Sequence, residues 1–347
     1  MPLIDVAALT EMVREVFLHN RVSAENAKIL AETCVFAERD GAESHGLFRL
    51  PGYIASLKSG WVDGFAQACV DAPGGGSIVK VDARNGFAQP ALRRAFARTV
   101  ALSHQHGICL LAIRDSHHFG PLWLDIEPFV DQGLVALAFV NSSTRVVPWG
   151  GHEPVYGTNP MAFGVPRRDA WPMIFDQSSS AVAFGDVKLA ALAGRKLPEG
   201  AGVDRHGNPT TEAAAVVDGG GLLPFGGHKG SSIALMVELL CAALNGGSFS
   251  FEVDHSSYAG AQTPRTGETL IVIDPAKTTH RDFTARTDEL FSRLRQAGQE
   301  RLPADRRYAR RRRAEQSGIE VSDGMIRLIA ELSCAPIESL STKRGNL

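Results

Sequence analysis

Residues 77–116 read SIVKVDARNGFAQPALRRAFARTVALSHQHGICLLAIRDS and give the clearest indication of the fold class. Apolar and polar side chains alternate over residues 77–83, as in a half-buried strand, and residues 107–116 form a second β-rich run. Between them, residues 90–106 carry apolar side chains at helical spacing. A strand, an amphipathic helix and a second strand in succession are typical of an α/β domain. We therefore predict a mixed α/β fold.

Strands are also expected further along the chain, at residues 134–142, 160–166, 172–176 and 269–275. A strongly apolar helix is expected over residues 231–247, ending at a glycine pair. Because the two ends of the chain have helical patterns instead, we predict two lobes. One is helical and contains residues 1–75 and 300–347, and the other is a mixed α/β domain of residues 76–299.

The amino-terminal segment is expected to contain three helical stretches. Residues 6–20 and 24–41 have apolar side chains at spacings of three and four, and Ser23 is in position to cap the second helix. The third stretch, residues 44–64, is expected to begin as a helix and to be interrupted at Pro51.

Composition excludes several classes of protein. With 44% hydrophobic and 21% charged residues and a formal net charge of -2, the chain is an ordinary globular protein with no overall field to attract nucleic acid or an anionic membrane. Its longest apolar runs are far shorter than the roughly 20 residues that cross a bilayer, and no signal peptide is evident. The 5 cysteines lie far apart without a CxxC pair, so we expect free thiols in the cytoplasm.

The first candidate site lies at Ser44-His45-Gly46-Leu47-Phe48-Arg49. If this segment is helical, His45 and Arg49 lie four residues apart on one face, where they can approach the same ligand. Arginine binds a carboxylate through two parallel hydrogen bonds, and histidine exchanges a proton near neutral pH. The alternative is a solvated helix face with a surface histidine.

A second candidate site, Ser116-His117-His118-Phe119-Gly120-Pro121, follows a predicted strand, where α/β proteins often bind ligands. Adjacent histidine side chains diverge, and no acidic or cysteine partner is found nearby at ligand spacing. We therefore predict no metal site.

The third candidate, residues 223–230, opens the apolar helix with glycines, His228 and Lys229. Free N–H groups at a helix start and the charge of Lys229 suit a nucleotide phosphate, although a simple glycine turn has the same pattern. No GxGxxG or GxxxxGK[ST] motif is present, so a bound dinucleotide would not use the Rossmann fingerprint. The arginine-rich run 306–313 favours a solvated helix face over nucleic-acid binding, with a cofactor phosphate as another partner for some of its arginines.

Four motifs in this order resemble the malate/L-lactate dehydrogenase-like oxidoreductases over nearly the whole chain: residues 44–53, 116–123, 146–167 and 222–232. Within that family, residues 85–92, 125–137 and 299–308 resemble the Δ1-piperideine-2-carboxylate/Δ1-pyrroline-2-carboxylate reductases. The resemblance implies a non-Rossmann NAD(P)-binding fold with a largely antiparallel mixed sheet. It also implies a homodimer whose helical lobe provides dimer contacts and part of the active site.

The resemblance also implies roles for individual residues. Ser44, His45 and Asp186 match a catalytic relay with His45 as the proton donor, and Asp186 would fix the tautomer of His45 and stabilise its charged form. Substrate contacts fall on Arg49, which anchors a carboxylate, and on Thr158, Phe184 and Gly185. Cofactor contacts fall on His118, Phe119, Gly120, Pro121, Leu122, Asp176, Gln177, Ser178, His228, Lys229, Arg301, Leu302, Pro303, Ala304, Asp305, Arg306 and Arg307.

Three features depart from the family pattern. Ser178-Ser179-Ser180 stands where relatives have an alanine-threonine-serine run, Phe184 where a polar side chain is common, and Ala304 where relatives have glycine.

The expected function is NADPH-dependent reduction of a cyclic imino acid to L-pipecolate or L-proline, within lysine and proline metabolism, with NADH as the alternative cofactor. Hydride is delivered to C2 of the C=N bond, while Arg49 holds the carboxylate and His45 serves the ring nitrogen. A 2-oxo acid or 2-hydroxy acid dehydrogenase is the alternative enzyme. A catalytically silent relative that binds a nucleotide or another ligand is the alternative of another class.

Overall fold

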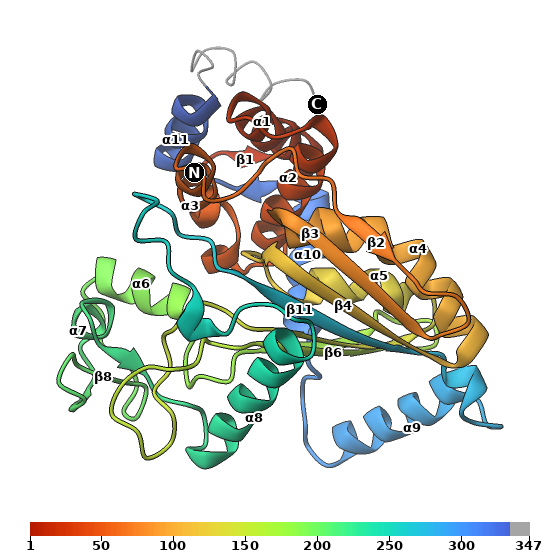
Figure 1. Ribbon diagram of the computed structural model, residues 1–347. Coiled ribbons are helices and arrows are strands. Elements are labelled where there is room, and N and C mark those ends of the chain that lie inside the picture. The colour runs from red at the N-terminus through yellow and green to blue at the C-terminus, as the bar shows by residue number, and fades with distance from the viewer. Residues whose placement is uncertain (334–347) are drawn as a thin grey trace.

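The computed structural model describes residues 1–333, and Figure 1 shows a sheet flanked by helices, with a helical layer at one end. The end of the predicted helical lobe, residues 334–347, and Cys334 lie outside the described residues.

The central sheet has seven strands in the order β2-β3-β4-β11-β5-β6-β7. Only β3 and β4 run parallel, and they are joined by helix α4, Ala88–His106; every other neighbouring pair in this sheet is antiparallel. The prediction of a mixed, largely antiparallel sheet is therefore confirmed. Its strands are β2 Cys69–Asp71, β3 Ile78–Phe87, β4 Ile108–His117, β5 Val135–Val140, β6 Met161–Val165, β7 Met173–Gln177 and β11 Arg265–Ile273.

Alternation along the strands assigns each face of the sheet to different helices. In β11, Leu270 and Val272 belong to the core formed with α4 and with α5, Trp123–Asp131. The intervening Ile271 packs on the other face with α8, His228–Glu238, and its π-helical extension Leu239–Ala243. Helix α9, Phe283–Gln296, covers this second face further along through Phe291. Both faces are thus covered, as the apolar strand sequences require.

Helices from both ends of the chain share one apolar core. Strand β1, Leu3–Ile4, pairs with β12, Ile319–Glu320, and α1 packs against α2 and α11. Ser23 Oγ accepts the N–H of Asn26 at 3.3 Å, which confirms the predicted cap of α2. The helices of this layer are α1 Val6–His19, α2 Ala24–Arg39, α3 Leu50–Lys58, α10 Asp305–Ser317 and α11 Asp323–Ser333.

The prediction for residues 44–64 is wrong in its details. The segment begins with two short 3-10 turns, Glu43–His45 and Leu47–Arg49, separated at Gly46, and α3 follows. Pro51 lies in the first turn of α3, where its missing N–H has no partner to lose, so it starts a helix and does not interrupt one. His45 and Arg49 consequently do not belong to one α-helix.

The prediction that residues 306–313 form a solvated face is also wrong at its centre. Arg311 is buried on α10, where it pairs with Asp40 at 2.5 Å and with Glu127 at 2.9 Å. The run therefore fastens α10 to α2 and α5.

A smaller subdomain contains α6, Phe184–Leu192, α7, Ala213–Val217, and a separate antiparallel sheet in the order β10-β8-β9. It has its own apolar cluster, which includes Val187, Val216 and Leu222. Its strands are β8 Gly202–Val203, β9 Pro209–Thr210 and β10 Gly221–Leu222, and two further 3-10 turns elsewhere span Ser250–Glu252 and Pro275–Lys277.

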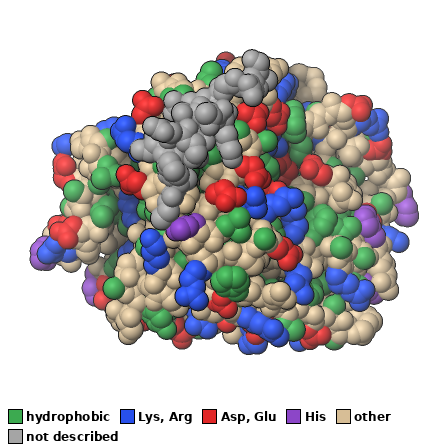
Figure 2. Space-filling view, turned by 90° about the horizontal axis from the view of Figure 1, so that it is seen from above, with side chains coloured by type: hydrophobic (Ala, Val, Ile, Leu, Met, Phe, Trp, Pro, Cys, Tyr) green, Lys and Arg blue, Asp and Glu red, His purple; other side chains and the backbone are tan. Residues whose placement is uncertain are grey.

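Figure 2 shows acidic and basic side chains interspersed over the face viewed from above, with no large area of one sign. Across residues 1–333, helices that combine the length and the apolar character needed to span a bilayer are absent.

Candidate active site

A cavity of about 1160 Å³ lies where the helical layer, the sheet and the small subdomain meet. Its walls include the turn that carries Ser44 and His45, the loop after β4, the end of β7 and the start of α6. This volume exceeds the roughly 300–1,000 Å³ typical of a small-ligand pocket. It is therefore large enough to hold parts of two ligands together.

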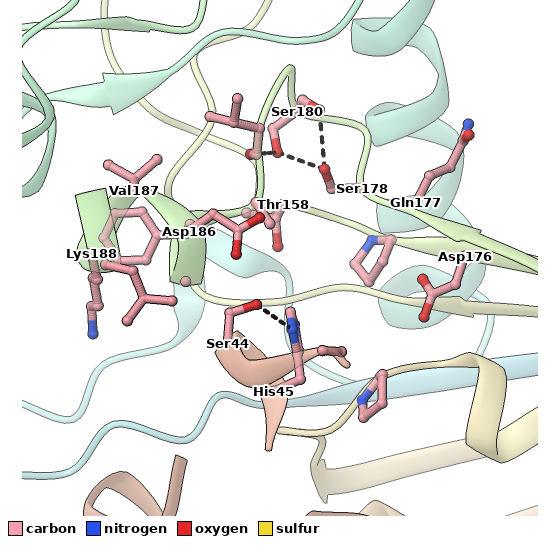
Figure 3. Close-up of a pocket in the computed structure, with 18 of the residues that line it drawn as sticks. Ser44, His45, Thr158, Asp176, Gln177, Ser178, Ser180, Asp186, Val187 and Lys188 are labelled. Atoms are coloured by element: carbon pink, nitrogen blue, oxygen red, sulfur yellow. Dashed lines mark hydrogen bonds between the residues drawn. The ribbon is translucent and has the colours of Figure 1, made fainter. Parts of the chain in front are cut away.

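Ser44 and His45 are joined by a hydrogen bond, since Ser44 Oγ lies 3.1 Å from His45 Nδ1 (Figure 3). Burial, with the nearby charges of Arg49 and His118, lowers the pKa of His45 to about 3. The imidazole is thus neutral at physiological pH in the ligand-free protein. Half-buried and facing a cavity, His45 is not the surface histidine of the alternative interpretation.

Arg49 is held in the same cavity with its charge exposed to a ligand. Its Nε donates to Ser44 O at 2.7 Å, and its guanidinium carbon lies 4.3 Å from the centre of the Phe119 ring. Burial lowers the pKa of Arg49 to about 10, against the raising effects of Tyr53 and Asp186, so the side chain stays cationic. Within residues 1–333 the guanidinium of Arg49 forms no ion pair, so it is available to a substrate carboxylate.

Asp186 projects from α6 toward Ser44 and His45 (Figure 3). In the described part of the chain its carboxylate makes no hydrogen bond to His45, whose Nδ1 contacts Ser44 instead. The direct orientation of His45 by Asp186 therefore stays a prediction. The remaining predicted substrate contacts, Thr158, Phe184 and Gly185, all line the cavity.

The serine run at residues 178–180, which departs from the family pattern at its first two positions, ties the end of β7 to the substrate side of the cavity. Ser179 donates both its N–H and its hydroxyl to Thr158 O, each at 2.9 Å. Ser180 Oγ donates to Val182 O at 2.7 Å and lies 3.0 Å from Ser178 Oγ (Figure 3). These hydroxyls fix the loop that leads into α6.

Most of the predicted cofactor residues line two adjoining cavities. His118 to Leu122 and Asp176 to Ser178 line the first cavity, and Asp176 Oδ2 accepts the N–H of Trp123 at 3.2 Å. A second cavity of about 810 Å³ is lined by Arg301 to Ala304, Arg306 and Arg307. The two cavities share Gly41, Ala42, Trp123, Arg306 and Arg310. Asp305 lines neither, and its carboxylate accepts the N–H of Leu302 at 2.9 Å.

His228 and Lys229 are exposed in the first turn of α8 and line neither cavity. In this single chain, neither residue therefore lies at a cavity where it could make its predicted contact with the cofactor.

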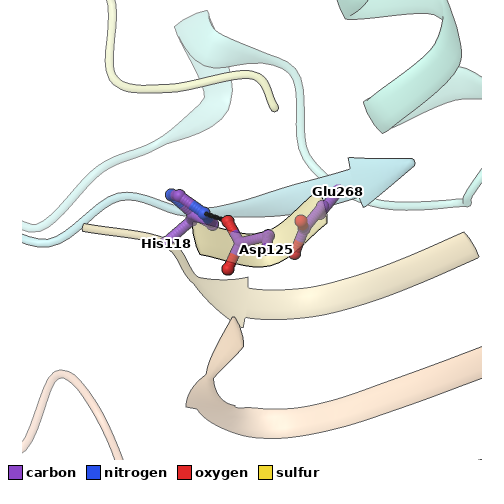
Figure 4. A group of neighbouring side chains, drawn as sticks. All are labelled: His118, Asp125 and Glu268. Carbon is purple, nitrogen blue, oxygen red and sulfur yellow. Dashed lines mark hydrogen bonds and ion pairs between the residues drawn. The ribbon is translucent and has the colours of Figure 1, made fainter. Parts of the chain in front are cut away.

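Sequence reasoning missed a buried cluster behind the cavity, His118, Asp125 and Glu268 (Figure 4). His118 Nε2 lies 2.7 Å from Asp125 Oδ2, and both oxygens of Glu268 are buried without a hydrogen-bond partner among the described residues. Burial lowers the pKa of His118, but the charge and hydrogen bond of Asp125, together with the charges of Glu268 and Asp176, raise it to about 9. Burial raises the pKa of Glu268 to about 8. Near neutral pH, His118 is therefore protonated and Glu268 is neutral, so the positive charge of His118 balances the negative charge of Asp125.

The premise that His118 has no acidic partner is wrong, because Asp125, seven residues further on in α5, and Glu268 on the neighbouring strand both reach it. The position of Asp125 in the first turn of a helix after the His118 loop was an available signal. No sequence signal connects Glu268 to this cluster.

A family model described as malate/L-lactate dehydrogenase matches residues 4–330. The chain belongs to the malate/L-lactate dehydrogenase family. The predicted resemblance is confirmed, and malate/L-lactate dehydrogenase family members of known structure share the fold. A putative malate/lactate dehydrogenase from E. coli is 28% identical, with a TM-score of 0.88 over 99% of this chain and 98% of that chain.

Similarity within the malate/L-lactate dehydrogenase family is higher to two bacterial reductases. The chain is 53% identical over 325 residues to the Delta(1)-pyrroline-2-carboxylate/Delta(1)-piperideine-2-carboxylate reductase of Pseudomonas syringae pv. tomato, covering 94% of each chain. It is 49% identical to the Pseudomonas putida reductase of that name, over 93% of this chain and 95% of that one. A crystal structure of the delta1-piperideine-2-carboxylate reductase from Pseudomonas syringae pvar. tomato has a TM-score of 0.94 at 52% identity, covering 96% of this chain and all of that one.

Proposed function

We propose that this chain is an NAD(P)H-dependent reductase that converts Δ1-piperideine-2-carboxylate to L-pipecolate and Δ1-pyrroline-2-carboxylate to L-proline. The proposal depends on one observation above all: His45 and the guanidinium of Arg49, which has no ion-pair partner within residues 1–333, face one cavity. A proton-exchanging group and a carboxylate anchor are what the reduction of a C=N bond beside a carboxylate requires. The two reductases at 53% and 49% identity support the same substrate class.

In this proposal Arg49 binds the substrate carboxylate, and His45 delivers a proton to the ring nitrogen. The bound nicotinamide supplies the hydride to C2. Because Arg49 lowers the pKa of His45, a carboxylate on Arg49 offsets that charge and raises the pKa of His45 toward the range useful for proton transfer. Ser44 holds Nδ1 of His45, so that Nε2 is the atom left for the substrate.

The residues of the second cavity fit a nucleotide with an additional phosphate. Arg306 and Arg307 line it. Arg307 Nη1 is buried and has no hydrogen-bond partner in the part of the chain that the structure describes, while its guanidinium carbon lies 4.3 Å from the Trp123 ring centre. An orphaned guanidinium nitrogen beside a second arginine suits a phosphate monoester. We accordingly expect NADPH to be preferred over NADH.

The test is a substrate panel followed by loss of nicotinamide absorbance with each cofactor. Both cyclic imines, pyruvate and oxaloacetate are compared at equal concentration. We expect the highest kcat/KM with an imine and NADPH. Turnover of only the oxo acids would overturn the imine proposal, and equal efficiency with NADH would overturn the cofactor preference.

A 2-oxo acid or 2-hydroxy acid dehydrogenase is the second candidate, because C=O reduction beside a carboxylate uses the same anchor and acid. It is favoured by the 41% identity over 300 residues to the (2R)-3-sulfolactate dehydrogenase (NADP(+)) of Chromohalobacter salexigens. If the protein binds the reduced cofactor but no substrate of the panel causes its oxidation, the protein would instead be a catalytically silent relative.

We also propose that the enzyme works as a homodimer in the cytoplasm, in lysine and proline metabolism. Leu235, Met236, Leu239 and Leu244 are 37% to 57% exposed along α8 and its extension, which supports a protein partner on this face. The four described cysteines are free thiols, in agreement with a reducing compartment. Light scattering should give about twice the 37.2 kDa chain mass, and a monomer mass would refute the dimer.

A further inference from the structure

Two cationic side chains of the first cavity, Arg145 and Lys188, have no part in the chemistry above. Arg145 follows β5 and Lys188 lies on α6, and both line the cavity that contains His45 and Arg49. Both flank one aromatic ring: the guanidinium carbon of Arg145 lies 4.6 Å from the centre of the Phe184 ring, and Lys188 Nζ lies 5.4 Å from it. Figure 3 shows Lys188 at the edge of the cavity, next to Val187.

Neither cation has an anionic partner within residues 1–333. Burial lowers the pKa of Arg145, and burial followed by the charges of Arg49 and Arg145 lowers the pKa of Lys188. Among the described residues, no acidic side chain offsets these effects. Lys196 makes a useful contrast, because it lines the same cavity but pairs with Glu212 at 3.1 Å.

Positive charge is therefore in excess around Phe184. Arg49 and Arg145 each lie near enough to Lys188 to lower its pKa, and Asp186 is an acidic residue of the cavity that acts on Arg49. A substrate with one carboxylate, bound at Arg49, leaves the other two cations uncompensated. Stacking on the Phe184 ring positions both side chains but does not neutralise them.

We propose that Arg145 and Lys188 form a second anion subsite, which takes a second carboxylate of the substrate in addition to the one held by Arg49. The ligand class is a cyclic imino acid with two carboxylates, such as a tetrahydropyridine-2,6-dicarboxylate. This assignment rests on the proposed function, because it takes the first carboxylate to bind Arg49. A cofactor phosphate is the other anion that these cations would fit, and the experiment separates the two.

The experiment compares unreactive ring analogues, so it does not depend on turnover. Binding of pyridine-2-carboxylate and of pyridine-2,6-dicarboxylate to the full-length protein is measured by calorimetry, with and without saturating NADP⁺. The variants are Arg145→Met, Lys188→Met and, as the matched control, Lys196→Met, each of which removes one positive charge from the cavity wall. Binding of NADPH is measured separately for each protein.

We expect the unmodified protein to bind the dicarboxylate at least about tenfold more tightly than the monocarboxylate, as one good charge-assisted contact allows. Arg145→Met and Lys188→Met should each remove most of that preference and change monocarboxylate and NADPH binding by less than about threefold, whereas Lys196→Met should keep it. Equal affinity for the two analogues, or a preference that survives both substitutions, overturns the subsite. So does a main effect on NADPH binding, which would assign the cations to a phosphate.

The kinetic counterpart uses the cyclic imino monocarboxylate and dicarboxylate as substrates. A higher kcat/KM for the dicarboxylate, lost in Arg145→Met, supports the subsite. If no imino or oxo acid turns over while the analogue preference is intact, the proposed function fails and the subsite stands.

Discussion

At the scale of single residues, the roles of Arg49 and His45 can be separated by kinetics. Arg49→Lys loses the planar fork that binds a carboxylate through two hydrogen bonds, so it should chiefly raise KM. His45→Ala should chiefly lower kcat, by about a hundredfold to ten-thousandfold, as expected for a positioned general acid. Both are measured at saturating NADPH, and cofactor binding should survive in both.

A near-normal kcat in folded His45→Ala would remove His45 from proton transfer. The reactant would then be an imine that binds already protonated, which agrees with the low pKa of His45 in the ligand-free protein.

Ala304 has a backbone conformation that favours glycine, with φ at 75°. An alanine in the left-handed region is strained by roughly 1–2 kcal/mol, and part of the gain on replacement is offset by the greater freedom of glycine in the unfolded chain. We expect Ala304→Gly to raise the free energy of unfolding by about 0.5–1 kcal/mol. Denaturant titration measures the change.

Ala297 provides the control for this substitution, because it ends α9 with an ordinary φ of -81°. Ala297→Gly relieves no strain and should be neutral or destabilising. Equal effects of the two substitutions would contradict the interpretation of Ala304.

At the scale of secondary-structure elements, α10 depends on one buried charge. Arg311→Met leaves Asp40 without its main partner in the interior, and breaking such a pair costs about 3–5 kcal/mol. Arg312→Met, at the next and exposed position, should change stability by less than about 0.5 kcal/mol. Thermal unfolding of both variants checks this, and similar melting temperatures would contradict it.

Arg311 and Arg312 are neighbours of the same type, yet one is buried and the other exposed. The sequence predicts where helices and strands lie better than it predicts which of their charged side chains are buried. Local patterns predicted the strands around residues 77–116, the helix at residues 6–20 and the apolar helix α8, and a predicted cap at Ser23 marked the start of α2. The burial of Arg311 was not predictable, because its partners Asp40 and Glu127 lie far away in the chain. The same holds for Glu268, which reaches His118 only through the pairing of β11 with β4.

The site residues that lie close together in the sequence were predicted better than those that lie far apart. Ser44, His45 and Arg49 lie within one short segment, and their residue types alone indicated a carboxylate ligand. Asp186 and Thr158 came only from the family resemblance, because a lone aspartate or threonine in a loop has many structural uses. Arg145 and Lys188 were missed because no motif marks a charge that lacks a partner.

At the scale of the whole molecule, stability should depend on pH through Glu268. Its pKa is about 8 in the folded protein and near 4.5 when unfolded, so the folded state holds its proton more tightly. This contribution to stability is complete below about pH 4.5 and is lost as the pH rises through 8. We expect Glu268→Gln, which cannot ionise, to lose less stability between pH 5 and pH 8 than the unmodified protein does.

Denaturant titrations at pH 5, 6.5 and 8 measure this difference, and parallel stability profiles for the two proteins would rule out the role of Glu268. The division into a helical lobe of residues 1–75 and 300–347 and a mixed domain of residues 76–299 stays a prediction at this scale.

The position of β11 between β4 and β5 has a consequence for the synthesis of the chain. The last residue of β5 is Val140, but the strand that joins it to β4 begins only at Arg265. At about 5–20 residues per second, a ribosome takes roughly 6–25 s to make the intervening chain. During that time β4 and β5 each present an open edge, which is the feature that invites aggregation. A nascent chain that stalls before Arg265 therefore needs a chaperone far more than one that stalls after Ile273 has emerged.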